Sequence, residues 1–212
     1  MRYDSSIINI TNITLDNKLE SKLSHINLRY VLSIPFKNIK EGLSITVVMM
    51  NPSKANLTES DPSVAKLIDF FSTFSVNKQF IKEVKVVNIF PVCSTKPSIA
   101  FEKVKEMEAI GEYKSIRQHN ILVIQNELKA TNIIVAAWGK PTEGTFPYLF
   151  YYREVSKVLK VLFSSKLGIY TFKVEGTGTL LTESNDPRHP AGTYGKAIIG
   201  LEKVSKGQLL GF

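Results

Sequence analysis

The amino-acid sequence predicts an α/β fold, a three-layer α/β/α sandwich in which a mostly parallel central sheet is covered by helices on both faces. From residue 43 onwards, nearly continuous apolar runs alternate with amphipathic segments that have helical spacing. Such apolar runs are typical of parallel strands that are buried on both faces. At 212 residues the chain is also long enough to bury a sizeable core within one domain.

Four segments have the composition of buried strands. Each is rich in Val, Ile and other strand-favouring residues, and polar or proline-containing turns follow them. Because helical segments separate the runs, we predict that the strands are mutually parallel. The predicted strands are residues 43–50, 84–89, 131–138 and 168–174. The pattern of residues 196–204 is mixed and does not predict one type of element.

The helices between these strands begin at recognisable residues. Asp61 followed by Pro62 starts the first helix, because Asp is a good N-cap and Pro suits the first helical turn. A second helix is predicted from about Pro97. Amphipathic spacing predicts two further helices, at residues 114–129 and 148–163.

The first 40 residues differ from the rest. Two runs, residues 6–14 and 29–36, are β-branched or alternating, and a polar stretch separates them. No linker-like composition follows. We therefore predict a single domain over residues 1–212, in which a β-rich N-terminal extension, residues 1–40, packs on a core formed by residues 41–212.

Composition excludes several classes of protein and of site. One cysteine, Cys93, permits no intrachain disulfide, and together with three scattered histidines it provides no zinc-ligand spacing. No glycine-rich phosphate loop and no nucleophile elbow occurs, so we predict no metal and no cofactor. No apolar run approaches the roughly 18 residues of a membrane span, and the first residues do not resemble a signal peptide. We expect a soluble cytoplasmic protein without membrane contact.

The charge balance favours an anionic partner. The chain has 27 Lys and Arg against 19 Asp and Glu, a net charge of +8, and its pI is about 9.4. Nucleic acid, phosphate metabolites and membrane surfaces all attract such a chain. The basic residues form no block, and a solvated helix face explains many of them equally well. The charge alone does not identify the partner.

Unusual polar residues follow the predicted strands. Asn51 follows the first strand, Asn88 lies near the end of the second, and Trp138 ends the third. His189 lies in a polar loop after the fourth. Because ligands bind beyond the carboxyl ends of parallel strands, we expect Asn51, Asn88 and His189 to line one pocket. Each residue also has an ordinary explanation: a turn or strand-end amide, a surface histidine, or core packing of the indole.

The strand-end motifs carry a resemblance to a known family. The run Val48 to Ala55, with Asn51-Pro52 at its centre and Asp61-Pro62-Ser63 after it, resembles the bacterial domain-of-unknown-function 1643 family. The continuation is similar over roughly residues 29–195, and includes Asn120 and the stretches 87–90, 136–139 and 187–190. The name of this family implies no activity.

More distantly, the order of these motifs resembles that of the uracil-DNA glycosylase superfamily, which also has a three-layer α/β fold. The resemblance implies that Asn51 positions the attacking water and that His189 stabilises the departing base. It implies that Asn88 reads a flipped base. We expect Phe90 and Trp138 to contact that base, although core packing also explains Trp138. For the DNA backbone the expected contacts are Ser53, Lys54, Lys140, Arg188 and Lys196.

Cleavage of an N-glycosidic bond leaves negative charge on the base, which a histidine donor can stabilise. Asn51 has no carboxylate to activate water, so we expect Asn51→Asp to accelerate the reaction. Three functions stay open. The chain is a DNA glycosylase acting on a uracil-like or modified base, a non-catalytic module that binds nucleic acid or a nucleotide, or a hydrolase or transferase that acts on a free nucleoside or small metabolite. The sequence leaves the oligomeric state open.

Overall fold

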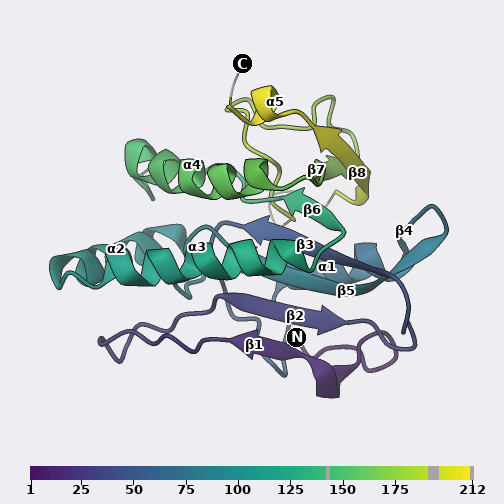
Figure 1. The fold of residues 1–212 in the computed structure, drawn as a ribbon, viewed down its shortest axis with the longest axis horizontal. Helices are drawn as coiled ribbons and strands as arrows, with labels where there is room; N and C mark the ends of the chain where they lie inside the picture. The colour runs from purple at the N-terminus through teal and green to yellow at the C-terminus, as the bar shows by residue number, and fades with distance from the viewer. Residues whose placement is uncertain (142–143, 191–195, 211–212) are drawn as a thin grey trace.

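The computed structural model describes residues 1–141, 144–190 and 196–210, and has a mixed α/β fold (Figure 1). Over these residues eight strands form one sheet. The strands are β1 (Thr14–Asp16), β2 (Val31–Pro35), β3 (Leu43–Met49), β4 (Ser75–Val76), β5 (Gln79–Asn88), β6 (Ile133–Ala136), β7 (Ile169–Val174) and β8 (Ile198–Val204). Their order in the sheet is β1-β2-β5-β3-β6-β7-β8, and β4 pairs with β5.

Helices cover both faces of this sheet. They are η1 (Ile10–Asn12, a 3₁₀ turn), α1 (Pro62–Thr73), α2 (Pro97–Ala109), α3 (Tyr113–Lys129), α4 (Tyr148–Ser164) and α5 (Lys206–Leu210). Figure 1 shows α2, α3 and α4 in front of the sheet and α1 behind it. Two clusters of buried apolar side chains, one on each face, form the core. No helix in the described part of the chain is both long and apolar enough to cross a bilayer.

The centre of the sheet is parallel and its margins are antiparallel. Strands β5, β3, β6 and β7 pair in parallel, as the sequence predicts. Strand β3 lies between β5 and β6, so the chain leaves β3 towards one side and later returns on the other. A parallel sheet opens a crevice at the carboxyl ends of its strands where the chain reverses in this way. The fold therefore places the expected site beyond the end of β3.

At the margins of the sheet, one sequence-based expectation is wrong and one stretch of mixed pattern proves to be a strand. Residues 6–14 do not form a strand: they contain η1, and the Thr11 hydroxyl donates to Oδ1 of Asn9 at 2.9 Å. Such local side-chain bonds compete with strand pairing. The mixed stretch at residues 196–204 contains β8, which pairs antiparallel with β7. Its pattern is mixed because only one residue of this marginal strand, Val204, is fully buried.

Strand β5 also begins earlier than its apolar run indicates. Residues 79–83 are largely exposed or half-buried and pair with β4 across the turn at Asn77 and Lys78. Both turn residues have positive φ angles, of 50° and 66°, as in the tight turns that join antiparallel strands. The hairpin does not affect the buried end of β5. That end reaches the cavity described below.

The start of α1 agrees with its predicted cap. Oδ1 of Asp61 accepts hydrogen bonds from the backbone N–H groups of Ser63 at 3.0 Å and Val64 at 2.9 Å. Pro62 occupies the first helical position. These bonds satisfy donors that a helix start leaves free, and they fix the Asp61 carboxylate at the carboxyl end of the sheet.

Candidate functional site

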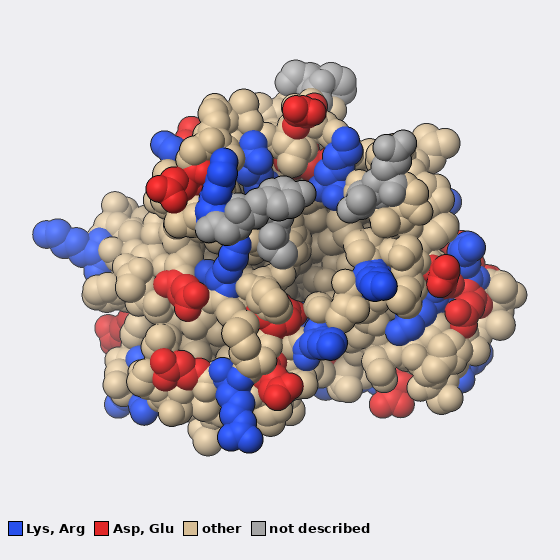
Figure 2. Space-filling view, turned by 180° about the vertical axis from the view of Figure 1, so that it is seen from behind, with Lys and Arg blue, Asp and Glu red and all other residues tan. Residues whose placement is uncertain are grey.

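A cavity of about 310 Å³ lies beyond the carboxyl ends of the central strands. Its wall contains Asn51, Asn88 and His189, together with Ser53, Trp138 and Lys140 from the sequence-predicted site. The wall also contains Arg29, Asp61 and Ser94, which the sequence analysis does not assign to the site. Figure 2 shows the molecule from behind, a face that is hollowed near its middle with Lys and Arg side chains on several sides of the hollow.

Asn88 is the last residue of β5 and presents an amide without partners. Its side chain is almost completely buried, at 1% exposure, yet neither Oδ1 nor Nδ2 has a hydrogen-bond partner among the described residues. The backbone there is well held, because Nδ2 of Asn120 donates to the carbonyl oxygens of Asn88 at 2.9 Å and Ile89 at 3.1 Å. A buried polar group without a partner costs about 1–3 kcal/mol. The amide is thus poised to pair with a group that enters the cavity.

Unlike the amide of Asn88, the amide of Asn51 has hydrogen-bond partners for its NH₂ group. Nδ2 donates to the carbonyl oxygens of Pro52 at 3.0 Å and Ser94 at 2.8 Å. This fixes the amide, because only an NH₂ group can face two carbonyl oxygens. Oδ1 is then the acceptor that Asn51 offers, and among the described residues it accepts no hydrogen bond. A water or a ligand hydroxyl can donate to it.

The bonds of Asn51 reverse the expectation about a carboxylate at this position. In Asn51→Asp, an oxygen would face the carbonyl oxygens of Pro52 and Ser94 without a hydrogen to donate. We expect the variant to lose about 1–3 kcal/mol of unfolding free energy at neutral pH and to lower any base release. Urea unfolding compared with Asn126→Asp, an exposed asparagine on α3, measures this. A faster and equally stable Asn51→Asp protein would contradict the bonding described here.

His189 is held in place by the loop that follows β6. The backbone N–H of Gly139 donates to the carbonyl oxygen of Pro187 at 2.8 Å, and the Tyr151 hydroxyl donates to the carbonyl oxygen of Gly139 at 2.7 Å. Burial lowers the pKa of His189 to about 4; the nearby Asp61 raises this pKa and Lys66 lowers it. The imidazole is therefore neutral at pH 7 and acts as a hydrogen-bonding group, not as a cation.

Gly139 has two reasons to be glycine. Its φ angle is +69°, and a Cβ at this position would lie 2.9 Å from Cβ of His189. We expect Gly139→Ala to displace the His189 loop and to cost more than the 1–2 kcal/mol of a left-handed non-glycine residue. Gly111→Ala is the control, since Gly111 has a φ of +71° and no neighbour within 4 Å of such a Cβ.

Thermal unfolding of both alanine variants measures how much more stability Gly139→Ala loses than Gly111→Ala. In Gly139→Ala an NMR titration should also move the pKa of His189 from about 4 towards its ordinary 6.5, as the ring becomes hydrated. Equal stabilities of the two variants and an unchanged titration would show that Gly139 does not position His189.

A second ionisable group precedes His189 in the same loop. Asp186 is 3% exposed and accepts a hydrogen bond from the Tyr152 hydroxyl at 2.8 Å. Burial raises its pKa to about 6, although Tyr152, the Trp138 indole and Lys140 all favour the ionised form. Trp138 itself is 1% exposed and separates the candidate cavity from a hollow of about 290 Å³ beside Asp186.

The pKa shifts of Asp186 and His189 have opposite effects on how the unfolding free energy depends on pH. Asp186 binds its proton more tightly when folded, so its contribution is present below about pH 4 and is lost as pH rises through 6. His189 binds its proton less tightly when folded, so its contribution is present above pH 6.5 and is lost as pH falls through 4. Between pH 4 and 6 the two contributions oppose each other.

Removing one group should expose the pH dependence of the other. We expect the unfolding free energy of Asp186→Asn, relative to wild type, to fall as pH is lowered from 6.5 to 4.5. The slope is at most about 1.4 kcal/mol per pH unit. His189→Gln should show the opposite slope. Urea unfolding at three pH values measures both variants, and parallel curves for all proteins would contradict the assignment.

The other predicted site residues are placed differently. Phe90 is fully buried and stacks on Phe146 with ring centroids 4.8 Å apart, so it has no exposed face for a base. The Arg188 guanidinium donates to the carbonyl oxygens of Thr179 at 3.1 Å and Leu181 at 3.2 Å. Neither Phe90 nor Arg188 is part of the cavity wall.

The three lysines that we predict to contact DNA lie at different places relative to the cavity. Lys140 is exposed and lines the cavity. Lys54 is exposed outside the wall, and Nζ of Lys196 donates to the carbonyl oxygen of Gly176 at 3.4 Å. Of the five predicted contacts of the DNA backbone, Ser53 and Lys140 line the cavity, and Lys54, Arg188 and Lys196 do not.

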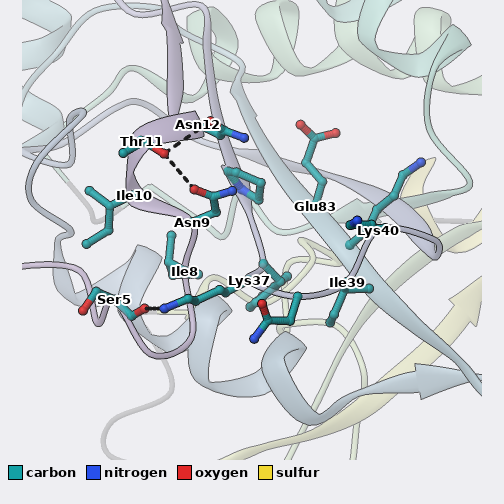
Figure 3. Close-up of a pocket in the computed structure, with 14 residues that line it drawn as sticks. Ser5, Ile8, Asn9, Ile10, Thr11, Asn12, Lys37, Ile39, Lys40 and Glu83 are labelled. Carbon is teal, nitrogen blue, oxygen red and sulfur yellow. Dashed lines mark hydrogen bonds between the residues drawn. The ribbon is translucent and has the colours of Figure 1, made fainter.

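A larger hollow, of about 760 Å³, lies at the opposite end of the sheet (Figure 3). Its wall is formed by η1 and its neighbours, the loop after β2 and the start of β5. Polar side chains there bond within the wall: Nζ of Lys37, for example, donates to the carbonyl oxygen of Ser5 at 3.0 Å. Among the described residues, none of the buried polar atoms without a partner belongs to this wall, so the smaller cavity is the better candidate.

Comparison with known proteins gives one match. The family model described as "Protein of unknown function (DUF1643)" matches residues 29–191, which include every residue named above in the cavity wall. No curated protein and no solved structure matches the chain. The likeness to the uracil-DNA glycosylase superfamily therefore rests on the order of the strand-end motifs alone.

Proposed function

Since the chain belongs to the family described as "Protein of unknown function (DUF1643)", a description that assigns no activity, we propose a function from the cavity itself. The cavity binds a nucleobase, flipped out of DNA, and the protein hydrolyses the N-glycosidic bond of that uracil-like or modified base. The observation that carries this proposal is the buried, unpartnered amide of Asn88. An amide offers a donor beside an acceptor, which is the complement of the edge of a nucleobase.

The neighbours of Asn88 supply the other needs of the reaction. Oδ1 of Asn51 can hold the water that attacks the sugar. Neutral His189 can donate to an oxygen of the base as negative charge develops there. Asn51 cannot take a proton from this water, so the reaction is dissociative and slow, and depends on stabilisation of the leaving base.

One observation favours a binding function without catalysis. Asp61 is the acidic residue of the cavity wall, and its Oδ1 already caps α1 through Ser63 and Val64. With this carboxylate engaged, Asn51 amidic and the pKa of His189 lowered to about 4, the described wall residues provide only weak general bases for water. The alternative is a module that binds nucleic acid or a nucleotide through the same amide and rim.

Single-turnover base release distinguishes the two functions. Duplex and single-stranded DNA carrying uracil, mismatched thymine or a modified cytosine are incubated with the protein, and abasic sites are detected by alkaline cleavage. DNA affinity is measured in parallel at several salt concentrations, because each neutralised phosphate makes binding more salt-sensitive. Release from one substrate supports hydrolysis. Salt-sensitive binding without release supports the binding module, and absence of both contradicts the proposal.

A further inference from the structure

Arg29 is a buried cation in the wall of the candidate cavity. It precedes β2, and its backbone N–H donates to the carbonyl oxygen of Pro91 at 2.8 Å. The residue is 3% exposed and lines the cavity together with Asn88. Arginine is almost never buried to this extent unless its charge is paired, so the partners of the guanidinium decide what it does.

The protein itself satisfies little of this guanidinium. A guanidinium has five N–H donors. Here the nitrogen Nη1 donates to the carbonyl oxygen of Ala55. Within the described residues, Nε is buried without a partner and the guanidinium has no ion pair. Leaving charged donors buried and unpaired is costly, and the arginine cannot escape this cost by losing its proton. A group that enters the cavity with acceptor oxygens would remove the cost.

Asp61 does not fill this role. It is close enough to influence the pKa of Arg29, but the ion pairs within 4 Å among the described residues do not join these two. Oδ1 of Asp61 accepts the α1 cap bonds, and Oδ2 faces the backbone N–H of Ala55 at 3.4 Å. The wall contains two positively charged residues, Arg29 and Lys140, and one negatively charged residue, Asp61. His189 is neutral at pH 7. The cavity therefore has an excess of positive charge.

We propose that the ligand of this cavity carries an anionic oxygen group, a carboxylate or a phosphate, and that Arg29 binds it. A guanidinium presents parallel N–H groups that match such oxygens in a bidentate pair. Arg29 is as deeply buried as Asn88, so the anionic group enters with the part of the ligand that Asn88 contacts. A cavity of about 310 Å³ is at the small end of ligand sites.

Two sources share this chemistry. The anionic group is either a carboxylate on a heterocycle or the phosphate of a free nucleotide. A DNA backbone fits less well, because its phosphates stay outside while the base enters. The first source rests on the proposed function and narrows its substrate to a base with an acidic substituent. The second is independent of base release.

Equilibrium binding to matched pairs of small molecules tests the inference. Calorimetry on wild-type protein compares orotate with uracil, and uridine 5′-monophosphate with uridine, and inorganic phosphate is measured alone. We expect at least one acid to bind roughly ten- to hundredfold more tightly than its neutral partner, as is typical of charge-assisted hydrogen bonds. The pair that shows the preference identifies the source. Equal binding within both pairs, or binding of neither acid, overturns the inference.

Variants assign the preference to Arg29. Arg29→Gln should remove it, Arg29→Lys should restore part of it, and Lys140→Gln, a charge change at the exposed rim, should leave most of it. A preference that persists in folded Arg29→Gln overturns the assignment. If that variant does not fold, the wild-type comparison still decides. Base release from DNA containing plain uracil, without any acid preference, would support the proposed function while contradicting this inference.

Discussion

His189→Ala is expected to slow base release by roughly a hundred- to thousandfold while leaving DNA affinity nearly unchanged. The neutral imidazole donates to a base oxygen whose negative charge exists mainly in the transition state, and the loss of one such donor costs about 2.7–4 kcal/mol. Alanine retains the Cβ against which Gly139 packs, so the loop should keep its position. Single-turnover release and binding, measured on the same substrate, separate the two effects.

A matched control is His25→Ala. His25 is an exposed histidine whose Nε2 lies 2.7 Å from Oε2 of Glu106, and neither residue lines the cavity. Its removal should change neither rate nor binding. If His189→Ala weakens DNA binding and slows release by the same factor, the imidazole contributes to recognition and not to departure of the base.

Asn88→Leu is expected to stabilise the protein and abolish ligand binding. In the part of the chain that the structure describes, the Asn88 amide has no partner for either of its polar atoms, so an apolar side chain of similar size loses no hydrogen bond. We expect the unfolding free energy to rise by about 1–3 kcal/mol. A gain of stability at the expense of binding is typical of residues kept for function. Urea unfolding and calorimetry measure the two effects.

Asn120→Leu is the matched control. Asn120 is equally buried, but its Nδ2 donates to the carbonyl oxygens of Asn88 and Ile89. Its replacement should therefore lower stability by about 2 kcal/mol, since two carbonyl groups lose their partner. A loss of stability in Asn88→Leu as large as that in Asn120→Leu would show that the Asn88 amide supports the fold.

The sequence predicts the centre of the fold because buried parallel strands have a distinctive composition. The four predicted strands correspond to β3, β5, β6 and β7, and their parallel pairing brings Asn51, Asn88 and His189 to one cavity. The margins are less predictable. Strand β8 has polar positions that face solvent, and residues 6–14 have β-branched composition but satisfy their polar groups locally.

Parts of the site depend on contacts that no local pattern reveals. Arg29 stands in an apolar run that predicts a strand, and the only signal is a charge where core residues are expected. The direction of the Asn51 amide is set by the carbonyl oxygen of Ser94, which belongs to a loop after β5. Phe90 follows the end of β5 and turns into the aromatic cluster around Phe146, which its position near Asn88 does not indicate.

The central position of β3 also has a kinetic consequence. Val48 of β3 pairs with Val87 on one side and with Ala136 on the other, so the sheet closes only after distant parts of the chain meet. Such non-local pairing makes folding slow. The cavity lies at this junction, and its wall is incomplete until β6 and the His189 loop have docked. A ligand bound there recognises the finished fold and is expected to act by slowing unfolding, with little effect on the rate of folding.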